Sequence, residues 1–461
     1  MIAVKFSLAA AAVGSQCDLE GSFDKISTDT RDISPGCMFI AVKGERFDGN
    51  DFAADAVASG AACALVERDC GLGLRQIIVP DTRKAMLQLA GFIRNQFDIP
   101  VIGVTGSVGK TSTKEMIALV MSSKFKTLKN TGNLNNEIGV PKTVFEITGD
   151  TQAAVIEMGM NHFGEISALT RAIKPTTAVI SNVGVSHIEN LGSREGILKA
   201  KLEITEGMPD GAPLIINADN DMLKTVRDDN HRIVTYGIEG EKCMFRAVNV
   251  VCGFDSVSFD LYIDGENCGE ISVPSGGKHT VYNALAATAA GVVNGIKPQE
   301  CAKALKGFIN TGMRQKIARL NGITFIEDCY NASPDSQKAA MQVLGKTGSG
   351  RKIAVIGDML ELGDYSETAH KNVGLYAAEN GVDILFSFGR DSEKAGENAK
   401  NLGVKTTKHF TDKNELADEL FSIIKPGDAV LFKASRGMKL EEVISRVYKS
   451  FEHETAVTEN E

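Results

Sequence analysis

The segment VIGVTGSVGKTS, residues 101–112, has the residue types and spacing of a phosphate-binding loop. A short apolar run leads into a turn with two glycines, and Lys110 and Thr111 follow at the start of a predicted helix. In such a loop, backbone N–H groups hold phosphate oxygens, the lysine faces the terminal phosphates and the threonine binds magnesium. Val104 stands where the strict pattern has a glycine. The residues assigned to the loop are Thr105, Gly106, Ser107, Val108, Gly109, Lys110 and Thr111.

Polar side chains that follow later apolar runs could complete a phosphate and metal site. Glu157 ends the run AAVIE, where its carboxylate could reach a metal held by the loop, and His187 follows TAVISNVG. The segment TGNLNNEIGVP carries the amides of Asn133, Asn135 and Asn136, which could bind phosphates or a polar substrate. A solvated strand-end glutamate, a structural histidine and turn-forming asparagines are the alternatives. The residue types alone leave both interpretations open.

Three successive patterns of strands and helices are expected to position these residues. Residues 1–82 predict a small α/β unit, and residues 83–313 alternate β-rich runs with helices, which is typical of a mostly parallel sheet wrapped by helices. Within the second pattern, residues 257–273 predict a hairpin with Asp264 and Gly265 as its turn. Residues 314–461 predict a second open α/β sheet of dinucleotide-fold type. The polar residues follow the C-terminal ends of strands, where open α/β sheets bind ligands.

The composition bounds the class of protein. A chain of 461 residues is too long for one hydrophobic core, and a formal net charge of −9 argues against a nucleic-acid or anionic-membrane partner. The nine cysteines are scattered singly without a Cys-x-x-Cys pair, as in proteins whose thiols stay reduced in the cytosol. KFSLAAAAVGS has some features of a signal peptide, but we expect a helix that packs small residues. No apolar run reaches the roughly 20 residues of a membrane span.

Eight segments together resemble the Mur ligase family, the ATP-dependent amide-forming enzymes of bacterial cell-wall synthesis. In chain order they are TGSVGKTS, TGNLNNEIGVP, EMGMNHFGEI, SNVGVSHIENLGS, AKLEI, YNALAA, DCYNASPDS and GDMLELG. The resemblance covers essentially the whole chain. CYNASPDS and GDMLELG favour the members that add a dipeptide over those that add the third peptide residue. The N-terminal segment STDTRDISPGCMFIAVKGERFDGNDF resembles the family's nucleotide-sugar domain and is not expected in folylpolyglutamate synthases.

The resemblance implies an architecture and a reaction. It assigns a UDP-muramoyl substrate-binding domain to residues 1–82, a central ATP-binding P-loop domain to 83–313 and a C-terminal Rossmann-like ligase domain to 314–461. The implied reaction joins D-alanyl-D-alanine to UDP-N-acetylmuramoyl-tripeptide through an acyl phosphate, with ATP and two magnesium ions as cofactors. We expect a monomer in the bacterial cytoplasm, with no nucleic-acid partner and no membrane insertion.

The resemblance also assigns roles to residues of the second and third patterns. Lys110, His187 and Lys201 become catalytic residues, and Thr111, Glu157, His187 and Lys201 become magnesium ligands. Taken alone, Lys201 reads as a solvated helix lysine, but the corresponding lysine of the family is carbamylated by carbon dioxide. The implied nucleotide contacts are Asn283, Arg314, Asp328, Tyr330 and Asn331.

Substrate contacts are implied in three further places. The residues that resemble the uridine-diphosphate pocket are Ser27, Thr28, Asp29, Arg31, Lys43 and Gly44, for which an ordinary turn with surface charge is the alternative. Asn133, Asn135 and Asn136 would face the muramoyl substrate, and Lys433, Ser435 and Arg436 the dipeptide. The family's usual Asp-Gly-His is replaced here by Asp48, Gly49 and Asn50. A P-loop switch and a non-catalytic binding module are the competing classes.

Overall fold

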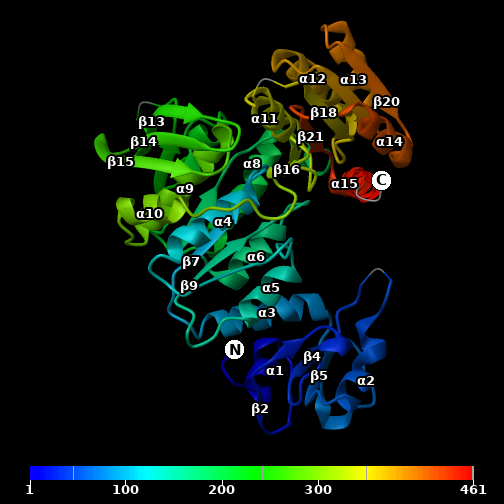
Figure 1. The fold of residues 1–461 in the computed structure, drawn as a ribbon. Helices are drawn as coiled ribbons and strands as arrows, with labels where there is room; N and C mark the ends of the chain where they lie inside the picture. The colour runs from blue at the N-terminus through cyan, green and yellow to red at the C-terminus, as the bar shows by residue number, and fades with distance from the viewer. Residues whose placement is uncertain (45, 241, 349, 459–461) are drawn as a thin grey trace.

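Three β-sheets follow one another along the chain. The computed structural model describes residues 1–44, 46–240, 242–348 and 350–458. Within them lie sheets of four, nine and six strands and a short two-stranded pair. Figure 1 shows the nine-stranded sheet, cyan to green, between the blue N-terminal unit and the yellow-to-red C-terminal unit. This is the three-part α/β architecture that the sequence predicts.

The N-terminal unit is built on a small parallel sheet in the order β3-β4-β5-β6. Its strands are β3 (Ile26–Ser27), β4 (Met38–Ile40), β5 (Cys63–Val66) and β6 (Gln76–Ile78). Before it stand β1 (Val4–Lys5), α1 (Phe6–Ala12) and β2 (Ser22–Phe23), and its connections contain α2 (Ala53–Ala58) and the 3-10 helices η1 (Thr30–Asp32), η2 (Gly49–Phe52) and η3 (Gly73–Arg75). Because KFSLAAAAVGS forms α1 with buried Phe6, Ala9 and Ala10, the expectation of a packed helix is confirmed.

Helix α3 (Thr82–Arg94) joins this unit to the central one. Asp81 caps its N-terminus by accepting a hydrogen bond from the Lys84 N–H at 3.0 Å. Apolar residues at three- and four-residue spacing, including Met86, Leu89 and Ile93, are completely or almost completely buried. They belong to one hydrophobic cluster that contains residues of both the N-terminal sheet and the central sheet. The two units therefore share a continuous core.

The central sheet has the order β15-β14-β13-β12-β11-β10-β7-β9-β8, and the seven strands from β13 to β8 in this order are parallel. Its strands are β7 (Val101–Thr105), β8 (Thr127–Lys129), β9 (Ala153–Glu157), β10 (Thr177–Ile180), β11 (Pro213–Asn217), β12 (Arg232–Gly237), β13 (Phe245–Cys252), β14 (Val257–Ile263) and β15 (Glu266–Val273). Asp264 and Gly265, at φ of 49° and 86°, form the turn of the antiparallel β14–β15 hairpin. The predicted hairpin is confirmed, because this turn needs two residues at positive φ.

Helices cover both faces of the central sheet. They are α4 (Lys110–Met121), α5 (Gly139–Phe145), α6 (Glu165–Ile173), α7 (Ile188–Leu191), α8 (Arg194–Leu202), α9 (Lys278–Val293) and α10 (Pro298–Leu305), with η4 (Glu203–Gly207) and η5 (Leu223–Thr225). Alternate residues of β9 point to opposite cores: Ala153 and Val155 pack with α4 and α9, whereas Ala154 and Ile156 pack with α3 and α6. Burial on both faces explains why these strands read as continuous apolar runs.

The C-terminal sheet has the order β16-β17-β21-β18-β19-β20 and is parallel except for the β16–β17 pair. Its strands are β16 (Lys316–Leu320), β17 (Ile323–Glu327), β18 (Lys352–Gly357), β19 (Ile384–Phe388), β20 (Thr406–Phe410) and β21 (Ala429–Lys433). Its helices are α11 (Pro334–Gly345), α12 (Ser366–Glu379), α13 (Glu393–Asn401), α14 (Lys413–Ile423) and α15 (Glu441–Thr458), with η6 (Gly363–Tyr365) and η7 (Arg436–Met438). Two hydrophobic clusters of its own lie on its two faces. In the described part of the chain, no helix is long and apolar enough to cross a membrane.

Candidate active site

The predicted phosphate-binding loop connects β7 to α4, as its sequence requires. Gly106 and Gly109 adopt φ of 155° and 78°, a region that favours glycine. A Cβ atom on Gly106 would stand 2.0 Å from the Ser181 Oγ, and one on Gly109 would stand 3.2 Å from the Asn283 Oδ1. Both glycines are therefore required by backbone conformation and by close neighbours. Val104 lies two residues before Gly106, inside β7, and is buried in the core.

Three residues after β10 hold the loop in place. The Asn182 side chain accepts hydrogen bonds from the N–H groups of Ser107 at 3.0 Å and Val108 at 2.9 Å, and it donates to the Val108 carbonyl at 3.0 Å. The Ser181 hydroxyl donates to the same carbonyl at 2.9 Å. The Gly184 N–H donates to the Ser107 Oγ at 2.9 Å. These contacts fix the loop from the end of a neighbouring strand, and none of the three residues was selected from its sequence context.

Lys110 lies against the loop that it follows. Its Nζ donates to the Gly106 carbonyl at 2.9 Å. Loss of solvent lowers the pKa of the Lys110 ammonium, and repulsion by Arg314 lowers it further, whereas the nearby Glu157 carboxylate opposes both. Arg314 comes from the segment that leads into the C-terminal unit, so cations from two units meet at the loop. Such a concentration of positive charge suits a polyphosphate.

Glu157 receives hydrogen bonds on both carboxylate oxygens. Thr111 donates from its hydroxyl to Oε2 at 2.7 Å, and Asn135 donates from its side-chain amide to Oε1 at 2.8 Å. Asn130 accepts from the Glu157 N–H at 2.9 Å, and the buried Lys114 ammonium donates to the Asn130 carbonyl at 2.7 Å. The loop threonine, a strand-end carboxylate and the amide-rich segment are thus brought together.

His187 and Lys201 lie close enough to Lys110 to interact with it electrostatically. His187, at φ of 63°, places its Nδ1 2.8 Å from the carboxylate of Glu361, which is itself at φ of 64°. Desolvation lowers the pKa of His187, and Lys110 and Lys201 act in the same direction, whereas Glu361 raises it. Lys201 is 2% exposed, and burial together with repulsion by Lys110 lowers its pKa well below the usual value. It is therefore a buried amine and not a solvated helix lysine.

The C-terminal unit contributes the opposite wall. The guanidinium of Arg314 stacks on the Tyr330 ring at 3.7 Å from its centre. Lys433, which is buried, donates to the Asp328 carboxylate at 2.7 Å and to the Asn331 carbonyl at 3.2 Å. Asp328, Tyr330 and Asn331 follow the C-terminal end of β17, and Lys433 is the last residue of β21. On the central side, the Thr113 hydroxyl donates to the Asn283 Oδ1 at 3.1 Å.

A cleft of about 550 Å³ lies between these walls. Most residues predicted for the nucleotide, the metal and the amide-rich loop line it: Ser107, Val108, Gly109, Lys110, Thr111, Asn133, Asn135, Asn136, Glu157, His187, Asn283, Arg314, Asp328, Tyr330 and Asn331. Lys433 lines it as well. Thr105, Gly106 and Lys201 lie behind the lining, and Ser435 accepts a hydrogen bond from the Leu360 N–H at 3.0 Å. Arg436 forms an ion pair with Glu441 at 2.8 Å.

The residues predicted for the uridine-diphosphate pocket lie apart from this cleft, in the N-terminal unit. The Ser27 hydroxyl donates to the Asp29 carbonyl at 2.9 Å, and Asp29 caps η1 while pairing with Arg31. The Arg31 contacts hold the pKa of Asp29 well below its usual range. Lys43 and Gly44 follow β4, whereas Ser27 is the last residue of β3 and Thr28 follows it, so the six residues lie at or beyond the C-terminal ends of two neighbouring parallel strands.

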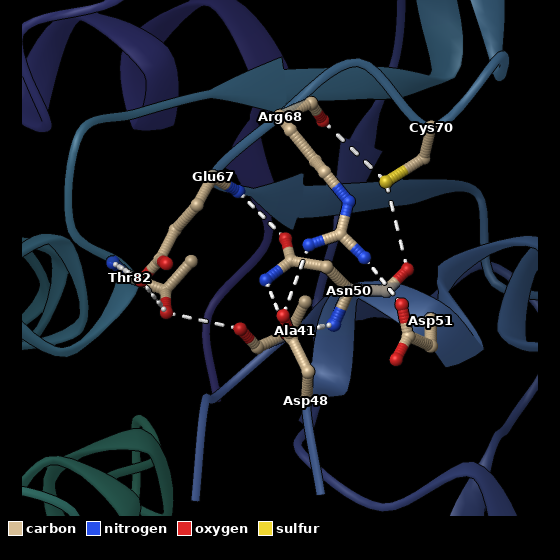
Figure 2. Close-up of polar contacts among 8 residues, drawn as sticks. All are labelled: Ala41, Asp48, Asn50, Asp51, Glu67, Arg68, Cys70 and Thr82. Carbon is tan, nitrogen blue, oxygen red and sulfur yellow. Dashed lines mark hydrogen bonds and ion pairs between the residues drawn. The ribbon is translucent and has the colours of Figure 1, made fainter.

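Asn50 takes part in a polar network at the same sheet edge (Figure 2). Its N–H and its side-chain amide donate to the Asp48 Oδ1 at 2.9 and 2.6 Å, and its Oδ1 accepts from the Glu67 N–H at 2.7 Å. The Asn50 contacts and Arg68 hold the pKa of Asp48 at about 2. The Glu67 carboxylate in turn accepts from the Thr82 hydroxyl at 2.9 Å. Asn50 is 3% exposed and acts here as a structural brace.

Three family models match successive parts of the chain. Their descriptions are Mur ligase family, catalytic domain, for residues 22–92, Mur ligase middle domain for residues 104–291, and Mur ligase, glutamate ligase domain, for residues 313–436. The UDP-N-acetylmuramoyl-tripeptide–D-alanyl-D-alanine ligase of Bacillus subtilis (strain 168) is 41% identical over 92% of this chain and 93% of its own. The chain belongs to the Mur ligase family. The Escherichia coli (strain K12) ligase of the same description is 37% identical over 93% of this chain and 95% of its own.

Solved Mur ligase structures have the same fold as this one. A crystal structure of MurF from Acinetobacter baumannii superposes with a TM-score of 0.90 at 32% identity, covering 97% of this chain and 99% of that chain. MurF ligase from Thermotoga maritima, in complex with ADP, gives a TM-score of 0.84 at 27% identity, covering 93% and 98%. The three-domain fold and membership in a family of ATP-dependent amide ligases are thus established for this Mur ligase.

Several residues at the site of this Mur ligase were not selected from the sequence. Asn182 and Asn130 hold the loop and Glu157, Lys114 supports Asn130, and Glu361 reaches His187 from the C-terminal unit. Asn130 and Asn182 each follow a β-strand directly or after one residue, and this position was the available signal. Glu361 belongs to GDMLELG, a segment that was recognised as a motif without a role for any one residue.

Proposed function

We propose that this Mur ligase joins the amine of D-alanyl-D-alanine to the terminal carboxylate of UDP-N-acetylmuramoyl-tripeptide, using ATP and completing the pentapeptide precursor of peptidoglycan. The observation that carries the proposal is the single cleft in which the phosphate-binding loop faces His187 and the C-terminal residues Asp328 and Tyr330. The near full-length similarity to ligases that are named for this reaction supports the choice of substrates.

ATP would bind across the central and C-terminal units. The N–H groups of the loop and Lys110 would hold its phosphates, because the loop glycines leave the backbone accessible and the Lys110 ammonium lies beside it. The proposed contacts to the rest of the nucleotide are Asn283, Arg314, Asp328, Tyr330 and Asn331. The polar walls from two units would then enclose the phosphates and exclude water from the reacting group.

The residues present fit magnesium. Thr111 and Glu157 already contact each other through hydroxyl and carboxylate oxygens, which are the ligands that this ion prefers. Among the described residues no group of three or more His, Cys, Asp or Glu side chains is placed to hold a metal. Magnesium commonly keeps water and substrate phosphates as its remaining ligands, so a set of few protein oxygens suits it. Bound magnesium would neutralise charge on the transferring phosphoryl group, with Thr111 and Glu157 at one site and His187 and Lys201 at a second.

Lys201 has the chemistry that carbamylation requires. Burial and Lys110 favour its neutral amine, which is the form that attacks carbon dioxide. The new N–C bond forms as one proton leaves the nitrogen, and the product carries a carboxylate. Within the described residues the amine has no hydrogen-bond or ion-pair partner, whereas a carbamate could satisfy both the adjacent cations and a metal. We therefore assign Lys201 this modification.

The chain's own residues would act by positioning and by charge. A free carboxylate is a poor acyl donor, so the tripeptide carboxylate must first attack the terminal phosphate of ATP, releasing ADP and forming an acyl phosphate. The dipeptide amine then attacks the acyl carbon, and phosphate leaves with one of the original carboxylate oxygens. Lys110 would stabilise the negative charge that gathers in both steps. No Ser or Cys nucleophile is required.

The remaining assignments follow from this reaction. The uridine diphosphate would bind at Ser27, Thr28, Asp29, Arg31, Lys43 and Gly44, and the muramoyl peptide at Asn133, Asn135 and Asn136. We divide the chain into a UDP-muramoyl domain at 1–82, an ATP-binding domain at 83–313 and a ligase domain at 314–461. Because one chain carries every proposed contact, a monomer would be active. The substrates place the reaction in the bacterial cytoplasm.

Incubation with ATP, magnesium, UDP-N-acetylmuramoyl-tripeptide and D-alanyl-D-alanine tests the proposal. We expect phosphate release that requires the dipeptide, and a product whose mass is that of the two substrates less one water. Phosphate release that is unaffected by omitting the dipeptide would instead identify a nucleotide switch. A free amino acid that replaces the dipeptide efficiently would identify a ligase for the preceding position.

Lys201→Ala gives a second, independent test of the site. We expect loss of product formation, whereas Lys199→Ala, an exposed lysine on the same helix, should retain it. Unchanged activity of Lys201→Ala would refute a carbamate at this position.

A further inference from the structure

Arg83 contacts loops of two different units at once. It is the second residue of α3, and its Nη2 and Nε donate to the Lys43 carbonyl at 2.7 and 3.2 Å. Its Nη1 donates to the Glu137 carboxylate at 2.6 Å. Lys43 belongs to the proposed uridine-diphosphate pocket, and Glu137 lies in the amide-rich segment, directly after Asn136. One guanidinium therefore connects the two ends of the path that a nucleotide-sugar peptide would follow.

Thr82, the residue before Arg83, anchors the loop of the N-terminal unit that contains Lys43. Thr82 is fully buried, and its hydroxyl lies 2.9 Å from both the Ala41 carbonyl oxygen and the Glu67 carboxylate, which share its single proton. Glu67 continues into the network of Asn50 and Asp48 that Figure 2 shows, and Asp48 forms an isolated bridge with Lys43. The first turn of α3 thus fixes Ala41 and Glu67 through Thr82, and it fixes the Lys43 carbonyl through Arg83.

The amide-rich loop of the central unit, residues 133–137, is anchored by contacts with residues of the proposed ATP site. Asn135 donates to the Glu157 carboxylate at 2.8 Å, and its carbonyl accepts from the Gly159 N–H at 2.8 Å. Asn136 accepts from the Gly139 N–H at 2.9 Å at the start of α5. Glu137 is the next residue, and Arg83 is its ion-pair partner. Contacts at Asn135 and Glu137 therefore set the position of the segment that carries the proposed substrate amides.

The exposure of the ion pair between Arg83 and Glu137 argues against a role in stability alone. The Arg83 and Glu137 side chains are 39% and 46% exposed, and ion pairs in such positions contribute little to the free energy of unfolding. A guanidinium does offer several donors in a fixed plane, so it can bind a carbonyl and a carboxylate together, which a lysine ammonium does with less geometric constraint. Geometry, and not stability, is what this side chain supplies.

We propose that Arg83 is a positioning residue that sets the spacing between the nucleotide-sugar loop at Lys43 and the amide-rich loop at Asn133–Glu137, so that one substrate engages both. The proposal rests on the proposed function, because it requires a substrate that spans the N-terminal and central units. Arg83 acts through the two loops and does not itself hold the diphosphate.

Steady-state kinetics of Arg83→Ala and Glu137→Ala test this role. Loss of a hydrogen bond to a charged group predicts a KM for UDP-N-acetylmuramoyl-tripeptide about tenfold higher in each variant. The KM for D-alanyl-D-alanine and kcat should change much less, because the acceptor side of the cleft is untouched. Lys84→Ala and Glu146→Ala are the matched controls, since both side chains are exposed and form no hydrogen bond or ion pair within the described residues, and both should behave as the parent chain.

The double variant distinguishes positioning from direct substrate binding. If Arg83 and Glu137 act through their shared ion pair, the KM of Arg83→Ala/Glu137→Ala should equal that of either single variant. If Arg83 instead binds the diphosphate, Glu137→Ala would free the guanidinium and leave the KM unchanged or lower it. That result, or fully additive effects in the double variant, would overturn the proposal.

Conservative variants separate the two halves of the contact. Arg83→Lys keeps the charge but not the planar donors, so the higher KM should persist. The exchanged pair Arg83→Glu/Glu137→Arg restores an ion pair without donors to the Lys43 carbonyl, and we expect it to fail as well. A parental KM in either variant would show that charge alone suffices, and it would contradict a positioning role that depends on the hydrogen bonds from Arg83 to the Lys43 carbonyl. A parent chain that forms no pentapeptide product would refute the proposed function itself, whereas normal product formation with an unchanged KM in Arg83→Ala would refute only this inference.

Discussion

The N-terminal and C-terminal units are attached to the central unit in different ways. On the N-terminal side, α3 buries Met86, Leu89 and Ile93 in a cluster that contains residues of both sheets. On the C-terminal side, the hydrophobic clusters belong almost entirely to that unit, and the connection is polar: Arg314 stacks on Tyr330, and Glu361 contacts His187. Figure 1 shows α3 lying between the N-terminal and central units.

This difference suggests different mobility for the two attachments. Separating a shared apolar core exposes its whole surface to water at a large cost, whereas polar contacts that break in water are replaced by hydrogen bonds to solvent. We therefore expect the N-terminal unit to keep its position while the C-terminal unit opens and closes over the cleft. Glu361 and His187 both adopt positive φ, so the contact between them uses two residues in a conformation that side chains other than glycine rarely take.

Leu89→Ala should produce the largest effect on this comparison. Truncating a leucine in a closed core typically costs about 2–5 kcal/mol, and Leu89 is 1% exposed at the junction. Urea unfolding measures the loss, and the N-terminal and central units should still unfold together. Leu402→Ala, an exposed leucine of the C-terminal unit, should change the free energy of unfolding by less than about 0.5 kcal/mol. A similar small loss in both variants would contradict the shared core.

Substitutions of His279, which contacts Gln315, test the polar connection between the central and C-terminal units. Its Nε2 lies 2.9 Å from the Gln315 Oε1, and the Gln315 side-chain amide donates to the Gly276 carbonyl, so the oxygen must accept from the histidine. His279→Ala leaves that oxygen without its donor and should cost about 1–3 kcal/mol.

The acid response of the same histidine has a defined sign. Desolvation, with help from Lys433, lowers the pKa of His279 below 6.5, although Asp328 and Gln315 oppose the shift. As pH falls through 6.5 the unfolded chain therefore binds the proton first, and stability is lost. Unfolding of the parent chain and of His279→Gln at pH 7.5 and 5.5 measures this, and the substitution should reduce the difference between the two pH values. An equal difference in both proteins would assign the acid response elsewhere.

Glu361→Ala should have the smallest effect on stability. The Glu361 carboxylate is 58% exposed, and loss of its pairing with His187 should change the free energy of unfolding by less than about 1 kcal/mol. Small-angle X-ray scattering in the presence of ADP should nevertheless show a larger radius of gyration, because one contact between the units is lost. A large loss of stability with unchanged scattering would mean that this contact holds the fold and not the closed arrangement.

The sequence predicted those parts of the site that depend on neighbouring residues. The loop from Thr105 to Thr111 lies between a strand and a helix as expected, and Asp264 and Gly265 form the expected turn. Asn182 was not predicted, because its partners Ser107 and Val108 are 75 and 74 residues away in the chain. A single sequence carries no sign of such a pairing, since it depends on β10 lying beside β7 in the sheet.

By itself, the sequence determined the strand and helix pattern, the phosphate-binding loop and the resemblance to a family, because each of these depends on residues that are close together in the chain. Only the tertiary structure decided that Lys201 is buried, that Asn50 braces a loop and that Arg83 joins two units. The physical reason is that burial and long-range contact are properties of the packed chain. The environment of an amine or a guanidinium depends on which distant segments surround it, and this sets its pKa and its partners.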